Sequence, residues 1–324
     1  MAPEGEATAS DPASDPGTAE VRNIRDVPGG GPTVLRIVLG QQLRALRERA
    51  GVTREAAGDR IRGSHAKISR LENGRTGFKE RDVADLLSLY GVHDVDERAQ
   101  MFALTQRANA PGWWHRYSDL LPPWFETYVG LEQAAAQIRT YEPQFVPGLL
   151  QTEAMVRHVT ALGHGSMSDE ELERRVELRL RRQRVLDAED PPTLWAVVDE
   201  AALRRLTGGA EVMRAQVDHL LEVSDRRHVI VQMVPFHLGG HAGAGGPFSI
   251  LRFAPRSEVP DVVYLEQLTS ALYLDKRSDV DDYLATMELL CVQALPPHAT
   301  RDALVALRDD LGGGRGTSRG LSPG

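Results

Sequence analysis

The stretch Ser-His-Ala-Lys-Ile-Ser-Arg-Leu-Glu-Asn-Gly-Arg, residues 64–75, decides the fold of the first part of this chain. Ile68 and Leu71 are three residues apart, so one face of a short helix can bury both of them. Ser64 is a residue type that caps the N-terminus of a helix, and Gly74 is one that ends a helix. The other side chains project outwards and include several cations. We interpret the segment as a surface helix that is recognised by another molecule.

Helical patterns extend on both sides of this segment. Leu39, Leu43 and Leu46 follow the spacing of one apolar stripe, and Gly51 ends that helix. Thr53 can cap a second helix, and apolar residues recur with helical spacing after residue 78. Residues 34–107 are therefore predicted to form an all-α bundle of five short helices. The first of these helices ends near Gly51, and the other four cover 53–61, 64–74, 79–89 and 95–107.

The charge of the chain is distributed unevenly. All 324 residues together carry a formal net charge of −8. Residues 34–92, with 12 basic and 7 acidic residues, carry +5, whereas residues 1–33 carry −4 and residues 93–324 carry −9. A basic segment between acidic flanks is typical of a local contact with a polyanion such as nucleic acid.

Residues 38–75 resemble the helix-turn-helix of the lambda-repressor/Cro-like (XRE) family. The matching features are the Leu-x-x-Leu-Arg pattern of the first helix, Thr53 followed by Glu55 and Ala57, the Ser64 cap and the run Ile-Ser-Arg-Leu-Glu-Asn-Gly. The resemblance implies a sequence-specific DNA-binding domain with helix 64–74 in the major groove, which is about 12 Å wide and accepts one helix.

The resemblance also assigns nine candidate DNA contacts. Some of them face bases and others meet phosphates, so we expect modest base readout and an affinity that depends strongly on salt. The base-facing residues are His65, Ala66 and Ser69; the residues near phosphates are Lys67, Arg70, Asn73 and Arg75; Ser64 caps the helix, and Arg54 strengthens the backbone contact at the start of the second helix.

Two positions in this domain need separate treatment. Arg62 and Gly63 occupy the turn where the family usually has Gly-Val, so we expect a looser turn within the same fold. Glu72 is left out of the DNA-contacting set because phosphate would repel a carboxylate. We expect Glu72 to pair with Arg44 or Arg47.

The remaining boundaries follow from composition. Residues 1–33 and 312–324 are rich in small and polar residues and are predicted to be disordered tails. Residues 108–124 hold three of the four tryptophans, which gain by burial, so this segment is predicted to be a packed connector. Residues 125–311 are predicted to form an α+β domain. Its helices are predicted at 125–140, 148–162, 168–187, 199–206, 211–225, 276–294 and 298–310, and its strands at 193–199, 228–235, 248–254 and 262–267.

This second domain carries another resemblance. Six segments look like the uncharacterised C-terminal domain that follows an XRE-type helix-turn-helix in actinobacterial WhiJ-like regulators, and the run Phe-Val-Pro-Gly-Leu-Leu-Gln-Thr at 145–152 is distinctive. These segments are 128–135, 141–157, 181–186, 197–205, 262–267 and 294–297. Such regulators are often paired with a small neighbouring protein. The resemblance implies a module that senses a ligand or binds a partner, and no enzymatic activity.

Two weaker patterns remain in this domain. His237 and His241 lie in a glycine-rich loop, 237–248, without a third metal ligand nearby, and no Gly-Lys-Ser/Thr follows the glycines. We expect no metal and no cofactor, and interpret this loop as a cover over a pocket with both histidines as candidate ligand contacts. The arginine-rich stretch 174–184 alternates with glutamates, which favours a solvated helix face over a second DNA contact.

These patterns together predict a cytoplasmic DNA-binding transcription regulator. The single Cys291 excludes an intramolecular disulfide framework, and no apolar stretch is long enough to span a membrane. Asp199, Glu200 and Glu266 lack a positioned histidine or nucleophile, so we expect no enzyme. The expected partners are double-stranded DNA, a second copy of the chain, and either a small-molecule effector or a small protein. The alternative is an antitoxin-like module that binds a small partner protein.

Overall fold

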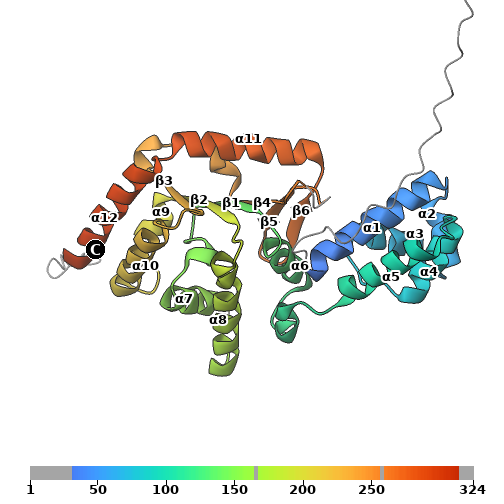
Figure 1. The fold of residues 1–324 in the computed structure, drawn as a ribbon. Coiled ribbons are helices and arrows are strands. Elements are labelled where there is room, and N and C mark those ends of the chain that lie inside the picture. Colours follow the sequence, from blue (N-terminus) through green and yellow to red (C-terminus); the bar gives the residue numbers. More distant parts are fainter. Residues whose placement is uncertain (1–30, 164–166, 256–258, 314–324) are drawn as a thin grey trace, which may run out of the picture.

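The chain folds into a helical N-terminal domain and a larger domain built on a six-stranded sheet (Figure 1). The computed structural model describes residues 31–163, 167–255 and 259–313. The predicted fold class is therefore confirmed. Most of the two predicted tails lies outside the described residues, but α1 begins at Pro32, inside the first of them, and α12 continues to Gly313.

The five predicted helices of the N-terminal domain are confirmed with small shifts at their ends. The side-chain oxygens of Thr53 and Ser64 accept hydrogen bonds from the amides of Ala56 and Lys67, at 3.2 and 3.3 Å, and so cap the second and third helices as expected. The helices are α1 (Pro32–Arg49), α2 (Arg54–Arg60), α3 (His65–Glu72), α4 (Glu80–Leu89) and α5 (Val95–Asn109).

A glycine sets the position of α3 on the bundle. A Cβ atom at Gly40 would lie 2.4 Å from the carbonyl oxygen of Leu71 and 2.6 Å from that of Glu72, so only glycine lets α1 and α3 approach this closely. Gly74 has a φ of 64°, a left-handed conformation that ends the helix at low cost. Backbone packing therefore fixes which face of α3 points outwards.

Backbone hydrogen bonds close the turn between α2 and α3. The amide of Gly63 donates to the carbonyl oxygen of Gly58 at 2.8 Å, and the amide of Arg62 donates to that of Asp59 at 3.1 Å. Ile61 is 2% exposed, so an apolar side chain fills the core one residue before the turn. These contacts close the turn without the family's valine, and the expected loosening relative to the family stays a prediction.

Glu72 forms a buried ion-pair network beneath α3. Its carboxylate is 3% exposed and accepts hydrogen bonds from Nε of Arg47 at 2.5 Å and from Nε of Arg54 at 2.9 Å. The expected pairing with Arg47 is confirmed, whereas Arg44 pairs with Glu48. These bonds tie the end of α3 to both α1 and α2.

The larger domain contains a mixed sheet with the strand order β3-β2-β1-β4-β5-β6. The first three strands run parallel, and each later strand is antiparallel to its neighbour. Four of these strands were predicted, and β1 and β6 were missed. The helix predicted over 125–140 ends at Glu132, because the chain enters β1 at Gln137. The strands are β1 (Gln137–Glu142), β2 (Thr193–Asp199), β3 (Val229–Val234), β4 (Phe248–Arg252), β5 (Val262–Glu266) and β6 (Ala271–Leu274).

Helices cover both faces of this sheet. In Figure 1, α11 lies along one face, and α7, α8 and α10 lie on the opposite side. Every helix among the described residues is too short or too polar to cross a lipid bilayer. The helices are α6 (Pro123–Glu132), α7 (Glu153–Leu162), α8 (Asp169–Gln183), α9 (Glu200–Arg204), α10 (Ala210–Val223), α11 (Arg277–Gln293) and α12 (Pro297–Gly313).

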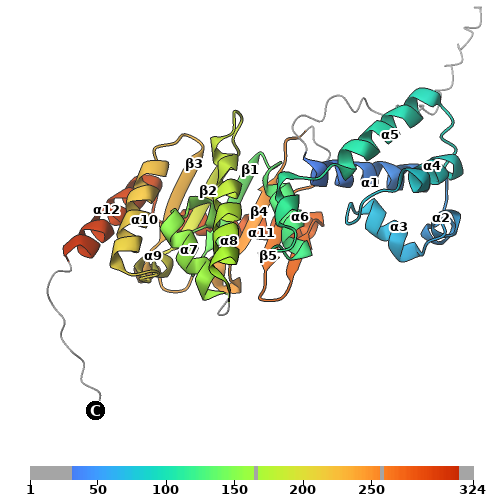
Figure 2. The ribbon, with the colours of Figure 1, turned by 90° about the horizontal axis from the view of Figure 1, so that it is seen from below.

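The helix α6 packs against the start of α1 and so connects the two domains. A Cβ atom at Gly130 would lie 2.0 Å from Oγ1 of Thr33, which shows how closely the Thr33 side chain packs on the backbone of α6. Before α6, a short 3-10 helix (Trp113–Tyr117) buries Trp114 against Val129 and other apolar side chains. Figure 2 shows the resulting elongated molecule, with α2 and α3 at the end that faces away from the sheet.

Replacing Glu72 by Gln should lower the free energy of unfolding by about 3 kcal/mol, because the buried Arg47 loses its anionic partner. Urea unfolding followed by circular dichroism measures this loss. Asp85→Asn is the matched control, since Asp85 faces Arg60 at 3.6 Å on the surface of the same domain. The control should cost less than about 1 kcal/mol. Equal losses in the two variants would contradict the structural role of Glu72.

Candidate nucleic-acid interface and ligand cavity

The predicted DNA contacts lie mainly on the outer face of α3. Ile68 and Leu71 are buried on its inner face, as their spacing predicts. The opposite face and the residues after the helix are open to solvent, so they can approach a duplex without rearrangement of the bundle. Ser64, His65, Arg70, Asn73 and Arg75 are exposed, and Ala66, Lys67, Ser69 and Arg54 are partly exposed.

Two of the predicted phosphate contacts are held by partners inside the domain. Nζ of Lys67 lies 2.6 Å from Oδ2 of Asp82, a buried carboxylate on α4. Arg54 is bonded to Glu72. By contrast, Arg70 and Arg75 make no ion pair with any of the residues that the structure describes. These two arginines are therefore the cations of the α3 surface that are most available to phosphate.

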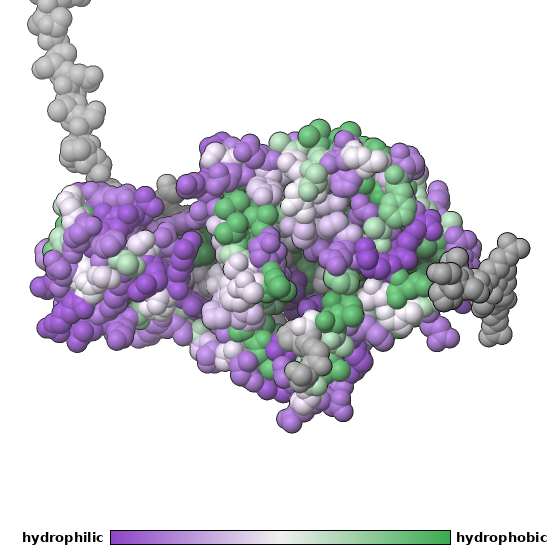
Figure 3. Space-filling model, turned by 180° about the vertical axis from the view of Figure 1, so that it is seen from behind, coloured by the Kyte–Doolittle hydropathy of each residue, from purple (hydrophilic) through white to green (hydrophobic). Residues whose placement is uncertain are grey.

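Surface character also differs between the two domains. Figure 3 shows a largely hydrophilic N-terminal domain on the side that it displays, whereas hydrophobic residues gather over the larger domain. Arg62, which was not among the predicted DNA contacts, is exposed at the tip of the α2–α3 turn with a φ of 52°. Its exposure beside α3 adds a further cation to the basic surface.

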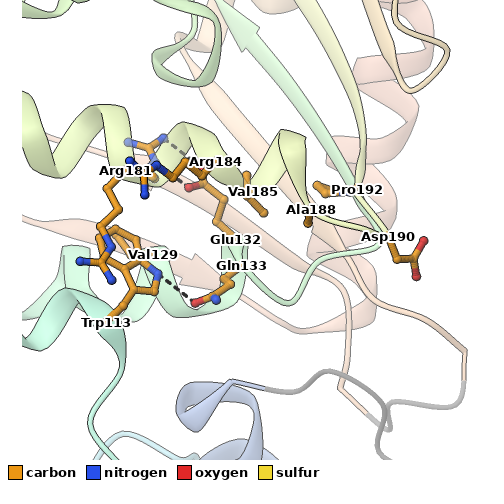
Figure 4. Close-up of a pocket in the computed structure, with 11 residues that line it drawn as sticks. Trp113, Val129, Glu132, Gln133, Arg181, Arg184, Val185, Ala188, Asp190 and Pro192 are labelled. Carbon is orange, nitrogen blue, oxygen red and sulfur yellow. Dashed lines mark hydrogen bonds and ion pairs between the residues drawn. The ribbon is translucent and has the colours of Figure 1, made fainter.

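One cavity of the larger domain lies between α6 and α8 and measures 360 Å³ (Figure 4). Its polar groups bind one another. Nε and Nη2 of Arg182 donate to Glu132 at 2.5 and 2.9 Å, and Nε1 of Trp113 donates to Oε1 of Gln133 at 3.1 Å. The guanidinium of Arg181 lies over the ring of Trp113. Little hydrogen-bonding capacity is left in these groups for a ligand.

The second cavity measures 890 Å³ and lies where α6, α8 and one end of the sheet meet. Four of the six segments that carry the second sequence resemblance contribute to its wall, through Tyr128, Phe145, Arg182 and Tyr264 among others, whereas 197–205 and 294–297 do not. The convergence of these four segments was not predicted. Their spacing along the chain gives no signal that they share one cavity.

Strand direction explains why two acids meet at this cavity. β1 and β5 are both antiparallel to β4, so they run in the same direction and end at the same edge of the sheet. Glu142 is the last residue of β1, and Glu266 is the last residue of β5. Crevices outside the carboxyl ends of strands are the usual ligand sites of open α/β sheets.

Arginines of α8 form another part of the cavity wall. Arg175, Arg179 and Arg182 are spaced at i, i+4 and i+7, so they share one face of the helix, and all three line the cavity. The predicted solvated face is wrong for these residues, because that face of α8 packs over the domain interior. One expected intrahelical pair is present, since Arg175 lies 2.8 Å from Glu171.

The charged groups of this cavity differ in how well they are paired. Arg182 is bonded to Glu132, whereas the side chains of Arg179, Glu142 and Glu266 form no hydrogen bond or ion pair within the described residues. Burial, followed by repulsion from Glu266, raises the pKa of Glu142 to about 7. Burial, followed by repulsion from Arg182, lowers the pKa of Arg179 to about 10. Both groups are costly to keep charged without a partner.

The two histidines proposed as ligand contacts do not line either cavity. Nε2 of His241 lies 3.4 Å from Oδ2 of Asp199 and 3.4 Å from Oη of Tyr141, and its Nδ1 accepts the amide of Gly243 at 3.1 Å. Of loop 237–248, only Pro247 and Phe248 reach the larger cavity. The described residues contain no group of three or more His, Cys, Asp or Glu side chains suited to a metal ion.

The raised pKa of Glu142 predicts a pH-dependent stability. The folded chain keeps a proton on Glu142 up to about pH 7, whereas the unfolded chain releases it near pH 4.5, so this group contributes less stability as pH rises through that window. At pH 8, Glu142→Gln should therefore be more stable than the wild type by about 2 kcal/mol, and at pH 4.5 the two should be similar. Urea unfolding across this pH range, with the exposed Glu211→Gln as the matched substitution, measures the difference. A gain in the free energy of unfolding of Glu142→Gln that is equally large at pH 4.5 would contradict the raised pKa of Glu142.

Comparisons with known protein families separate the chain into two matched regions. Residues 38–101 match a family model described as a helix-turn-helix domain, which indicates DNA binding. Residues 125–305 match the model of a domain of unknown function (DUF5753). No curated protein and no solved structure matches the chain. Because the second match covers more than half of the chain, this protein belongs to the family that carries the domain of unknown function DUF5753.

Proposed function

We propose that this protein is a sequence-specific transcription regulator that inserts α3 into the major groove of DNA and responds to a ligand in the 890 Å³ cavity. The proposed DNA binding rests on the exposed face of α3 and the residues that follow it. They present His65, Arg70 and Arg75, while the other face of α3 is buried. A single recognition helix in this setting fits one half-site of a duplex.

Base readout and phosphate binding are divided between different side chains. His65 stands at the start of α3, where short or hydrogen-bonding side chains reach base edges. Arg70 and Arg75 carry the electrostatic contacts to phosphate. Arg54 and Lys67 stabilise the position of α3 through Glu72 and Asp82, and they reach phosphate only at the margin of the interface.

Two copies of the chain bind one operator in this proposal. A lone domain contacts only a half-site, so useful affinity at cellular salt needs a second domain on the same duplex. The proposed operator is an inverted repeat whose half-site centres lie about 10 base pairs apart.

The helix α6 provides the physical connection between the cavity and the DNA-binding domain. Trp124, Phe125 and Tyr128 of α6 line the cavity, while Gly130 lies against Thr33 of α1. A ligand that changes the packing of α6 therefore changes the support of α1, against which α3 packs at Gly40. The unpartnered charges of the cavity favour a small ligand over the alternative of partner-protein capture.

The division of roles on α3 predicts distinct effects on DNA binding. Duplexes selected by the full chain from a random pool should contain the inverted repeat. Arg70→Ala and Arg75→Ala should each weaken binding to selected and unselected duplexes alike, and lower the slope of log affinity against log salt by about 0.9 per lost phosphate contact. His65→Ala should mainly reduce the preference for the selected duplex.

Arg277→Ala is the matched control, because Arg277 is 94% exposed and begins α11, on the larger domain. Figure 1 shows that α11 lies away from α3. Fluorescence anisotropy between 50 and 200 mM salt measures the affinities. The proposal fails if Arg277→Ala weakens binding as much as Arg70→Ala, or if the wild-type chain selects no duplex.

A further inference from the structure

We infer that the 890 Å³ cavity binds a zwitterion, a small molecule with a carboxylate and an ammonium group on an apolar body, such as an amino acid or a short peptide. This inference rests on the proposed function, because it names the ligand of the sensing cavity. It comes from three features of the wall, which are a cation and two acids whose side chains have no partner among the described residues, and an apolar surface.

The cationic feature is Arg179, which presents a planar guanidinium without a hydrogen bond or ion pair in the described part of the chain. Arg175 and Arg182 on the same helix face already have carboxylate partners, Glu171 and Glu132. Arg179 is therefore the arginine of this wall that is free to bind the carboxylate of a ligand. Such a contact can be bidentate, which makes it strong and directional.

The acidic feature is the pair Glu142 and Glu266 at the shared edge of the sheet. Neither carboxylate accepts a hydrogen bond from a described residue. The two acids repel each other, so a cation placed between them removes that repulsion as well as pairing with both. An ammonium group, with three donors, satisfies two carboxylates and has a donor left over.

Buried polar atoms in the same wall also lack partners. Oη of Tyr264 and Oε1 of Gln151 make no hydrogen bond within the described residues, although these residues are only 5% and 3% exposed. The indole Nε1 of Trp124 is likewise buried and unbonded there. These atoms include both donors and acceptors, so a ligand with both kinds of group satisfies them better than an anion or a cation alone.

The apolar feature is a set of aliphatic and aromatic side chains that line the same cavity. Leu120, Leu121, Phe145 and Phe248 line the cavity together with the rings of α6. Aromatic and aliphatic walls with a few placed polar groups are typical of small-molecule sites, and 890 Å³ lies within their usual size range of about 300–1,000 Å³. A ligand without an apolar body would leave this surface in contact with water.

Probes that differ only in charged groups test the inference on the wild-type chain. L-Phenylalanine carries both groups, 3-phenylpropanoate lacks the ammonium group, and 2-phenylethylamine lacks the carboxylate. The dipeptide phenylalanyl-leucine keeps both groups on a longer body and distinguishes a peptide from a free amino acid. Isothermal titration calorimetry should show that one of the two zwitterions binds at least about tenfold more tightly than either single-charge analogue.

Two substitutions then test which wall residue binds the carboxylate and which binds the ammonium group of the ligand. Arg179→Met should weaken binding of the zwitterion and of 3-phenylpropanoate by about tenfold or more, but leave 2-phenylethylamine unchanged. Glu142→Gln should weaken binding of the zwitterion and of 2-phenylethylamine, but leave 3-phenylpropanoate unchanged. Arg184→Met is the matched control, because Arg184 lines only the smaller cavity. It should bind all probes as the wild type does.

The outcomes separate this inference from the proposed function. If wild-type chain binds a selected duplex but neither zwitterion binds better than its single-charge analogues, the ligand class is wrong and the DNA-binding proposal stands. If a zwitterion binds with the predicted pattern but no duplex is selected, the regulator proposal fails and the ligand assignment stands. Equal effects of Arg179→Met and Arg184→Met would also overturn the ligand assignment.

Discussion

The ion pair between Arg182 and Glu132 is the contact on which the arrangement of this molecule depends. Its side chains are 13% and 1% exposed, and two hydrogen bonds join them in a bidentate geometry. The guanidinium also lies over the rings of Phe125 and Tyr128, at 5.3 Å from each centroid. Because a buried ion that loses its partner costs several kcal/mol, α6 is held firmly on α8. The position of α6 in turn determines both the cavity and the support of α1.

The same physical distinction separates structural from functional charges in both domains. Glu72 and Asp82 are buried and bonded to cations, so Arg54 and Lys67 are partly committed to holding α3. Arg70 on the outer face has no such partner among the described residues. In the larger domain, the side chain of Arg182 is paired, whereas that of Arg179 on the same helix has no partner in the part of the chain that the structure describes. In each domain, the paired ions fix a surface on which the unpaired ions are available to an external partner.

Local signals in the sequence were sufficient for the N-terminal domain. Ser64 and Thr53 cap helices as predicted, and Ile68 and Leu71 are buried because three-residue spacing places them on one helix face. The comparison supports a helix-turn-helix domain but does not distinguish its subfamily. The closed turn at Arg62 was not predictable from a family pattern, because its stability depends on backbone hydrogen bonds and on Ile61.

The larger domain shows where sequence reasoning stops. The strand β1 was missed because alanines at 134–136 favour a longer helix, and β6 was missed because it is a short strand of only four residues. The cavity was not predicted because Glu142 and Glu266 come together only through the order and direction of the strands. The glycine-rich loop drew attention to His241, yet the segments with the distinctive resemblance line the cavity instead.

The most direct test of the account is whether α6 transmits a change at the cavity to the DNA-binding domain. Hydrogen–deuterium exchange of the full chain, compared between wild type and Glu132→Gln, measures this connection. The account predicts faster exchange in α6 and α8, and also in the first turns of α1, with unchanged exchange in α10 and α12. Faster exchange in α6 with no change in α1 would contradict it, because α6 would then move without affecting the domain that holds α3.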